Sequence, residues 1–350
     1  MPESLWPRVA DLPLTVDAHA IERLEAPAPA ERVTYLVRLR GGDAEGLGED
    51  VGGDMLDEKG AFRAAAPSLA LAGEWTLATF FDHLAGLDLW PEPPEWDMAR
   101  RWRRWAFESA ALDLALAQAG LGLPEALGRE PAPLRFVNSL GLGDPPAFGT
   151  VGRRLERYPG VRFKLDAAAS WSPSLAAEVA ATGAVDVIDF KGRYELPVED
   201  EFALLAMYEA VPDRFPDAIL EDPHDRPDVA ALIEPHAARV SFDAPIATAA
   251  DIAAAPFGAR IVNVKPSRIG GVRALLDIYE HCERNGVRMY GGGMGELGVA
   301  RGQIELLAAL FHPDGPNDVA PSAYNLPDLP PGLPESPLTP PAGVTGFRWA

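Results

Sequence analysis

Residues 218–243 read AILEDPHDRPDVAALIEPHAARVSFD, and this stretch decides the fold class. An apolar run ends in Glu221, a Pro-flanked loop leads into the helical segment DVAALIEPHAA, and a second apolar run ends in Asp243. Short apolar runs that alternate with helical segments indicate parallel strands joined by helical crossovers. The stretch therefore predicts one strand–helix–strand unit of a parallel sheet.

The same unit recurs on both sides of this stretch. We expect strands at 135–140, 161–165, 185–190, 218–221, 239–243, 260–265 and 287–290, and a weaker eighth strand within 318–324. Seven or eight such units in about 190 residues fit a closed barrel better than an open sheet. The fold class is therefore predicted as α/β, with a (β/α)₈-type barrel over residues 131–324.

The residues before the barrel follow a different pattern. The alternation of apolar and polar residues in RVTYLVRLRGG (32–42) is typical of a strand in a small antiparallel meander that turns at the glycines. The stretch RWRRWAFESAALDLALAQAGL then predicts a long buried helix that ends at Gly120 or Gly122. We expect an α+β domain over residues 1–130, against which the Pro-rich tail 325–350 packs.

Composition narrows the class of function. The 350 residues include 31 Lys plus Arg against 52 Asp plus Glu, and the formal net charge of −21 argues against nucleic acid or an anionic membrane as partner. Cys282 is the single cysteine, which excludes an internal disulfide and a cysteine-based zinc site. The start MPESLWPRVADLPL lacks the pattern of a secretory signal, and no apolar run reaches the length of a membrane span, so we expect a cytoplasmic protein.

Each predicted strand in the middle of the chain ends in a charged residue. In chain order these residues are Lys164, Asp189, Glu221, Asp243 and Lys265, and Glu296 follows in GGGMGE. The carboxyl ends of parallel barrel strands meet at one mouth, so these side chains should converge there. A single charged residue at a strand end is ordinarily just the point where the chain meets water. Its repetition in successive units favours a functional site.

The order of these residues points to a chemistry. Asp189, Glu221 and Asp243 come from three neighbouring strands, and carboxylates at close quarters raise one another's pKa unless a cation relieves the repulsion. Hard oxygen donors with room for water and substrate suit Mg²⁺. Lys164 and Lys265 flank the trio, and a lysine near a bound cation is pushed toward the neutral amine, which can act as a base. Such a site could remove the proton α to a carboxylate and stabilise the resulting enediolate.

The motifs around these residues resemble the enolase superfamily, in its muconate cycloisomerase and o-succinylbenzoate synthase-like branch. The resemblance covers most of the chain and rests on RFK (162–164), VIDFKG (187–192), ILEDP (219–223), SFDAP (241–245), NVKPSRIGG (263–271) and GGGMGELG (291–298). It implies an N-terminal capping domain, Mg²⁺ at the three carboxylates and an acid/base pair at Lys164 and Lys265. It also implies that two capping-domain loops, near 26–31 and 50–55, close over the mouth.

This chain departs from the family pattern at several positions. Arg162 stands in the place of the first lysine of a Lys-x-Lys pair and cannot serve as a base, so we expect it to add positive charge for substrate binding. Asp166 could pair with Lys164 and keep it charged. Lys191 replaces a common Asn, and Ala244 a common Glu. LDAAASWS also resembles the family's third-strand motif, which would make Asp166 the first metal ligand, but we retain Asp189 because the alternative gives the barrel one strand too many.

We therefore predict a Mg²⁺-dependent lyase or isomerase that acts on a small carboxylate by dehydration, cycloisomerisation, racemisation or epimerisation. Glu296 would orient the substrate, and the glycines around Gly293 would let backbone N–H groups approach a substrate anion at a helix N-terminus. One alternative is a non-catalytic ligand-binding protein on an enolase-like scaffold, suggested by the departures from the family pattern. A weaker alternative is a nicotinamide-dependent oxidoreductase, suggested by the G-x-G-x-x-G match at 293–298. Homo-oligomerisation is left open.

Overall fold

The computed structural model describes residues 4–26, 32–53, 69–90, 94, 96–194 and 200–349. Of the two loops expected to close over the mouth, near 26–31 and 50–55, residues 27–31 and 54–55 lie outside these ranges. Among the described helices, none has the length and apolar character needed to cross a bilayer.

The N-terminal region contains the antiparallel meander that the alternating pattern predicted. Strands β2 (Ala18–Glu25), β3 (Val33–Gly41) and β4 (Ala44–Asp50) pair antiparallel in that order, and β1 (Pro13–Val16) pairs antiparallel with β5 (Gly73–Thr76). The helices among the described residues of this region are α1 (Pro7–Ala10), α3 (Leu77–Ala85), α4 (Asp97–Ala119) and α5 (Leu123–Leu127). The expected α+β arrangement is therefore confirmed.

Helix α4 is the long buried helix expected from the sequence, and it ends at Gly120, whose φ of 67° is the left-handed conformation that glycine adopts readily. It packs against β4 at very short range. A Cβ added at Gly46 would lie 2.1 Å from the Ala110 carbonyl oxygen, and one at Gly48 would lie 2.0 Å from that of Ala106. The glycines in the motif EGLGED thus allow the helix to lie directly on the strand.

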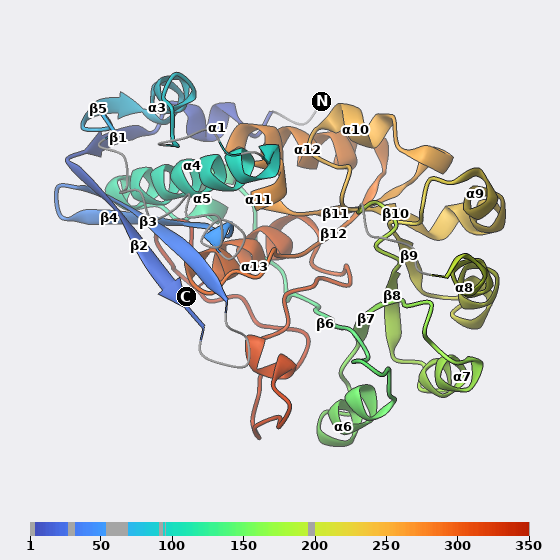
Figure 1. The fold of residues 1–350 in the computed structure, drawn as a ribbon. Coiled ribbons are helices and arrows are strands. Elements are labelled where there is room, and N and C mark those ends of the chain that lie inside the picture. The colour runs from blue at the N-terminus through green and yellow to red at the C-terminus, as the bar shows by residue number, and fades with distance from the viewer. Residues whose placement is uncertain are drawn as a thin grey trace.

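The second region is a parallel sheet in which strand order follows chain order (Figure 1). Its strands are β6 (Asn138–Leu140), β7 (Phe163–Asp166), β8 (Val185–Asp189), β9 (Ile219–Glu221), β10 (Val240–Phe242), β11 (Ile261–Val264) and β12 (Arg288–Gly291). Its α-helices are α6 (Gly149–Arg157), α7 (Pro173–Ala181), α8 (Glu201–Arg214), α9 (Pro227–Ile233), α10 (Ala249–Ala253), α11 (Pro266–Ile269), α12 (Val272–Asn285) and α13 (Val299–Phe311). Short 3₁₀ turns lie at Glu234–Arg239, Pro256–Gly258 and Ser322–Asn325.

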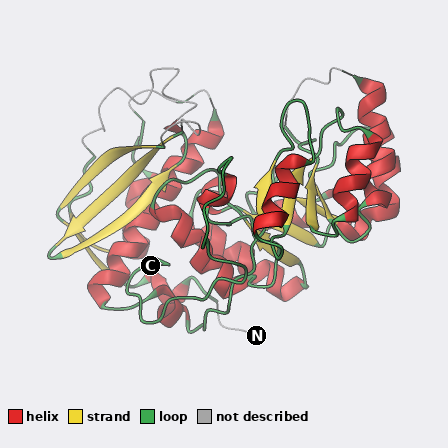
Figure 2. Ribbon diagram, turned by 90° about the horizontal axis from the view of Figure 1, so that it is seen from below, coloured by secondary structure: helices red, strands yellow, loops and turns green. Residues whose placement is uncertain are grey.

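Helices α7, α8 and α9 lie along the outer side of this sheet, away from the three-stranded sheet β2–β4 (Figures 1 and 2). A run of parallel strands with helices outside and an α+β region at the N-terminus is the predicted barrel class. The fold prediction is confirmed.

The eighth strand differs from the prediction. Residues 322–325 form a 3₁₀ turn, and the position of the missing strand is taken by Asn317 and Asp318 alone. Asn317 forms a parallel bridge to Phe136 beside β6, and Asp318 forms one to Gly292 beside β12. Pro316 and Pro321 flank this segment, and proline lacks the N–H group that would extend a strand ladder. Two residues therefore link the edges of the sheet.

Inward-facing side chains fill the barrel below its mouth. Val187, Ile219, Ile261 and Tyr290 form a small buried cluster of their own. Side chains two residues apart share one face of a strand. Asp189 and Glu221 therefore lie on the same inward faces as Val187 and Ile219, one layer higher. The C-terminal tail contacts both regions: Leu338 forms a bridge to Leu134, and the buried Phe347 ring lies edge-on to Trp105 of α4 at 6.2 Å.

Candidate active site

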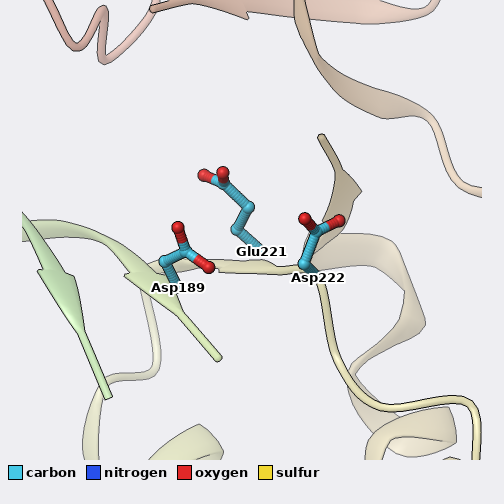
Figure 3. Close-up of side chains that lie close together, drawn as sticks. All are labelled: Asp189, Glu221 and Asp222. Carbon is cyan, nitrogen blue, oxygen red and sulfur yellow. The ribbon is translucent and has the colours of Figure 1, made fainter. Parts of the chain in front are cut away.

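The mouth of the barrel brings four acidic side chains into one buried volume. Asp189 ends β8, Glu221 ends β9, Asp222 follows it directly, and Asp243 follows β10. Each of the four is at most 1% exposed. Oxygens of Asp189, Glu221 and Asp222 lie within 4.8 Å of one another, close enough to share one metal ion (Figure 3). The predicted convergence of Asp189 and Glu221 is therefore present in the structure.

Asp222 is a member of this group that the sequence analysis did not single out. Adjacent residues of a strand normally point to opposite faces, so Asp222 would be expected to face away from Glu221. Its backbone φ of 47° is left-handed, and its carboxylate accepts hydrogen bonds from the N–H groups of Asp243 and Ala244 at 2.8 and 2.9 Å. Burial, followed by the charges of Asp243 and Glu221, raises the pKa of Asp222 to about 7. The acidic doublet in ILEDP was the available signal.

Asp243 lies beside this group but is engaged by cations. Its two oxygens lie 2.8 Å from Lys265 Nζ and 2.6 Å from a terminal nitrogen of Arg268. Burial alone would raise the pKa of Asp243, but these two cations outweigh it and lower the pKa. Among the described residues, the three carboxylates close enough to share one ion are therefore those of Asp189, Glu221 and Asp222. The sequence analysis expected Asp243 as the third. A metal-binding role for Asp243 stays a prediction.

Lys164 lies between two of the carboxylates. Its Nζ is 2.6 Å from Glu221 Oε1 and 3.1 Å from Asp189 Oδ2, and the side chain is 1% exposed. Burial alone would lower the pKa of Lys164, but the charges of Glu221 and Asp189 raise it well above its usual value. With these carboxylates unscreened, Lys164 keeps its proton. A role as base therefore requires additional positive charge at the carboxylates.

Glu221 is held by neutral groups as well as by Lys164. Asn263 Nδ2 donates to Oε1 at 3.1 Å, and the Tyr290 hydroxyl donates to Oε2 at 2.6 Å. Both residues lie on neighbouring strands and point inward. The sequence analysis did not identify either residue. The available signals were that Asn263 lies two residues before Lys265 and that Tyr290 ends an apolar strand.

Lys191 forms a second cationic contact with Asp189. Its Nζ lies 2.5 Å from Asp189 Oδ2 and 3.1 Å from Asp166 Oδ1. Asp166 therefore pairs with Lys191, and the expectation that it pairs with Lys164 is wrong. In the register of the sheet, Asp166 of β7 lies opposite Asp189 of β8. Asp166 thus belongs to the same strand as Lys164, and Asp189 occupies the third barrel strand as predicted.

Arg162 does not join the site. Its guanidinium contacts Asp186, the second residue of β8, at 2.5 Å and donates to the Gly183 carbonyl just before that strand at 2.7 Å. Both partners lie at the end of the sheet opposite the mouth. The pairing of β7 with β8 shifts register between Phe163 and Lys164. This irregularity breaks the two-residue periodicity that would have placed Arg162 beside Lys164. The expected substrate-binding role of Arg162 is therefore corrected.

Glu296 and Gly293 contact each other within one loop. Both oxygens of Glu296 accept the Met294 N–H at 2.9 Å, so the carboxylate folds back onto its own loop. A Cβ added at Gly293 would lie 2.0 Å from Glu296 Oε2. The glycine therefore makes room for Glu296, and the substrate-binding roles of both residues stay predictions.

The helix N-terminus expected to bind a substrate anion is filled by the chain itself. Glu49 of β4 accepts hydrogen bonds from the N–H groups of Leu297, Gly298 and Ala300 at the start of α13, at 2.6, 2.9 and 3.2 Å. The Thr34 hydroxyl donates to the same carboxylate at 2.7 Å. These are the N–H groups that the G-x-G-x-x-G match would need for a dinucleotide phosphate, so the nicotinamide alternative loses its basis.

The donor set fits a hard divalent cation. Buried carboxylate oxygens from adjacent positions are the ligands that Mg²⁺ prefers. A cavity of about 560 Å³ lies beside Lys191, between the loops that follow β7 and β8 and helix α8. Its lining includes Phe190, Leu204 and Met207. The cavity adjoins the mouth through Lys191, which contacts Asp189 and also lines the cavity.

Comparisons with known proteins agree with this architecture. A family model described as "Domain of unknown function (DUF8230) N-terminal domain" matches residues 7–126, and the corresponding C-terminal domain model matches residues 130–326. Among curated proteins, the chain is 27% identical over 235 residues to an o-succinylbenzoate synthase of Geobacillus stearothermophilus, covering 63% of this chain and 59% of that protein. It is 30% identical over 233 residues to an N-succinylamino acid racemase of an Amycolatopsis species, covering 63% and 61%. The matches thus span about three fifths of these relatives.

Solved structures of the enolase superfamily share the fold. A 2-chloromuconate cycloisomerase from Rhodococcus opacus aligns with a TM-score of 0.68 at 18% identity, over 96% of this chain and 95% of that one. A dipeptide epimerase from Methylococcus capsulatus complexed with a Mg ion gives 0.62 at 20% identity, over 85% and 86%. An enolase superfamily member from Listeria innocua gives 0.62 at 21% identity, over 89% and 84%. The predicted resemblance to this superfamily is confirmed for the fold.

Proposed function

Because this chain belongs to the DUF8230 family and has the fold of the enolase superfamily, we propose that its barrel mouth is a Mg²⁺-dependent active site that removes the proton α to the carboxylate of a small acid. The reaction would be that of a lyase or an isomerase. The observation that carries the proposal is the group of buried carboxylates at Asp189, Glu221 and Asp222, flanked by lysines from separate strands.

Asp189, Glu221 and Asp222 would hold the cation, with Asp243 adjoining them. When bound, Mg²⁺ supplies the positive charge that favours an enediolate over the parent acid. Asn263 and Tyr290 fix the Glu221 carboxylate by hydrogen bonds, so this ligand is oriented before any ion or substrate arrives. The remaining chemistry belongs to the two lysines.

Lys164 lies in β7 and Lys265 directly follows β11, the second and sixth strands of the ring, so the two approach the mouth from opposite sides. An acid bound between them presents one face to each amine. One lysine can then take the α-proton while the other returns a proton to the opposite face, or one can act alone. The apolar recess beside Lys191 is large enough for the part of the acid that does not react.

Solvent exchange tests this proposal. The protein is incubated in D₂O with Mg²⁺ and a set of small carboxylic acids, and loss of the α-proton signal is followed by NMR. We expect exchange with at least one class of acid, and Lys164→Ala should lower its rate by about a hundredfold or more. Arg162→Ala is the matched control, because it removes a cation from the same strand region but away from the mouth.

Two results would contradict the proposal. One is the absence of exchange with every acid in the presence of Mg²⁺. The other is exchange that persists in the double variant Lys164→Ala plus Lys265→Ala at the wild-type rate.

One observation favours the alternative of a non-catalytic binding protein. The mouth carries cations that match its carboxylates in number: Lys164, Lys191, Lys265 and Arg268 face Asp189, Glu221, Asp222 and Asp243. A site balanced in this way is stable without a metal. This alternative predicts that calorimetry detects no binding of Mg²⁺, whereas the proposed active site predicts binding.

A further inference from the structure

Lys191 donates hydrogen bonds to both oxygens of Asp189. Its backbone N–H donates to Oδ1 at 3.0 Å, and its ammonium donates to Oδ2 at 2.5 Å. The backbone at Lys191 has a left-handed φ of 53°, which is uncommon for a residue other than glycine. This conformation turns the chain back so that one residue can contact the carboxylate twice. Lys164 Nζ lies 3.1 Å from the same Oδ2.

The ammonium of Lys191 also has a second partner on the rim. Asp166 Oδ1 lies 3.1 Å away, and the Asp166 side chain is 40% exposed, against 1% for Asp189. The Lys191 side chain is 32% exposed, and its ammonium lies between a buried carboxylate of the proposed metal site and the partly exposed carboxylate of Asp166. A small movement toward Asp166 would leave it paired while freeing Asp189 Oδ2.

We propose that Lys191 is a built-in competitor for the divalent cation at Asp189, and that Asp166 receives its ammonium when the cation binds. This inference rests on the proposed metal site. Lys191 at 2.5 Å and Lys164 at 3.1 Å together occupy both lone pairs of Oδ2. A metal ion at this oxygen therefore displaces one ammonium, and Lys191 is the one with a further carboxylate, Asp166, outside the proposed metal site. In the absence of the ion, the same ammonium offsets the cost of burying the Asp189 charge. Lys191 thereby weakens metal binding. Asp166 reduces this weakening, because it keeps the displaced ammonium paired.

Calorimetric titration with Mg²⁺ alone tests the competition. We compare the wild-type protein with Lys191→Met and with Arg193→Met, a control that removes one positive charge from the same loop. Arg193 pairs with Asp225 at 3.3 Å, not with the proposed ligands. Lys191→Met should tighten binding by about tenfold, in the range of coupling between contacting groups. Arg193→Met should change the dissociation constant less than about twofold.

Asp166→Asn tests the second half of the inference. In the wild-type background it should weaken Mg²⁺ binding, because the displaced ammonium loses its partner. In the Lys191→Met background it should have no effect, because there is no ammonium to receive. An equal effect in both backgrounds would overturn the role of Asp166. Lys191→Gln, which keeps a polar side chain, provides a second variant if Lys191→Met does not fold.

The outcomes separate this inference from the proposed function. If neither the wild-type protein nor a folded Lys191 variant binds Mg²⁺, the metal site itself is wrong and the proposed function fails with it. If the wild-type protein binds Mg²⁺ and Lys191→Met and Lys191→Gln bind it equally or more weakly, only the competition is overturned.

Discussion

Two buried carboxylates of this molecule meet the same physical problem in different ways. Glu49, between the N-terminal sheet and helix α13, is surrounded by neutral donors: three backbone N–H groups and the Thr34 hydroxyl. Asp189, at the barrel mouth, is held mainly by the ammonium groups of Lys164 and Lys191. Both side chains are excluded from water, with exposures of 0% and 1%.

The difference indicates which carboxylate can exchange its partners. The N–H groups that hold Glu49 belong to a helix terminus and the loop before it, so they cannot leave without local unfolding. The ammonium groups that hold Asp189 stand on flexible side chains and can yield to another cation. Glu49 therefore joins two regions of the fold permanently, whereas the partners of Asp189 are suited to replacement by a metal ion.

The largest expected effect on stability follows from removing Glu49. Glu49→Ala leaves buried N–H groups at the start of α13 without acceptors, and we expect it to lower the free energy of unfolding by about 2–3 kcal/mol. Urea denaturation measures this change. The control Glu45→Ala removes a 40% exposed carboxylate from the same strand and should cost less than about 1 kcal/mol. Similar losses for the two variants would contradict the anchoring role of Glu49.

A smaller change in the free energy of unfolding is expected when the pH is lowered, because of another buried hydrogen bond between neutral groups. His312 Nδ1 donates to Asn317 Oδ1 at 2.7 Å, which fixes the segment that closes the barrel, and burial lowers the pKa of His312 to about 4. The unfolded chain takes up this proton near pH 6.5. The stability contributed by His312 is therefore fully present above that pH and is lost as the pH falls toward 4, by about 2 kcal/mol at pH 5.

Urea denaturation at pH 7.5 and pH 5 measures this loss. Because other groups also titrate in that range, the comparison is with His312→Gln, whose stability should fall less between the two pH values. An identical fall in both proteins would show that His312 is not responsible.

Much of the mouth could be predicted because it depends on regular geometry. Parallel strands place their carboxyl ends together, and the two-residue period of a strand assigns each side chain to a face. These rules suffice for Lys164, Asp189, Glu221 and Lys265. The position of Asp243 beside them follows in the same way, although its pairing with Arg268 required the structure.

The remaining differences arise where the regular geometry is interrupted. A register shift moves Arg162 away from the mouth, and left-handed backbone at Asp222 and Lys191 turns both toward it. Glu296 folds back because Gly293 leaves it space, and Glu49 reaches α13 from a strand nearly 250 positions earlier. Periodicity in a sequence contains no information on these local conformations or on contacts between distant segments.

Binding of Mn²⁺ as a substitute for Mg²⁺, followed by electron paramagnetic resonance, tests the central claim most directly. The free ion gives a sharp signal that is lost on binding, so the measurement reports occupancy without a substrate. We predict that the wild-type protein binds Mn²⁺ and that Glu221→Gln binds it at least about tenfold more weakly. A free-ion signal that persists with the wild-type protein, or equal binding by the variant, would contradict the assignment of the barrel mouth as a metal-dependent active site.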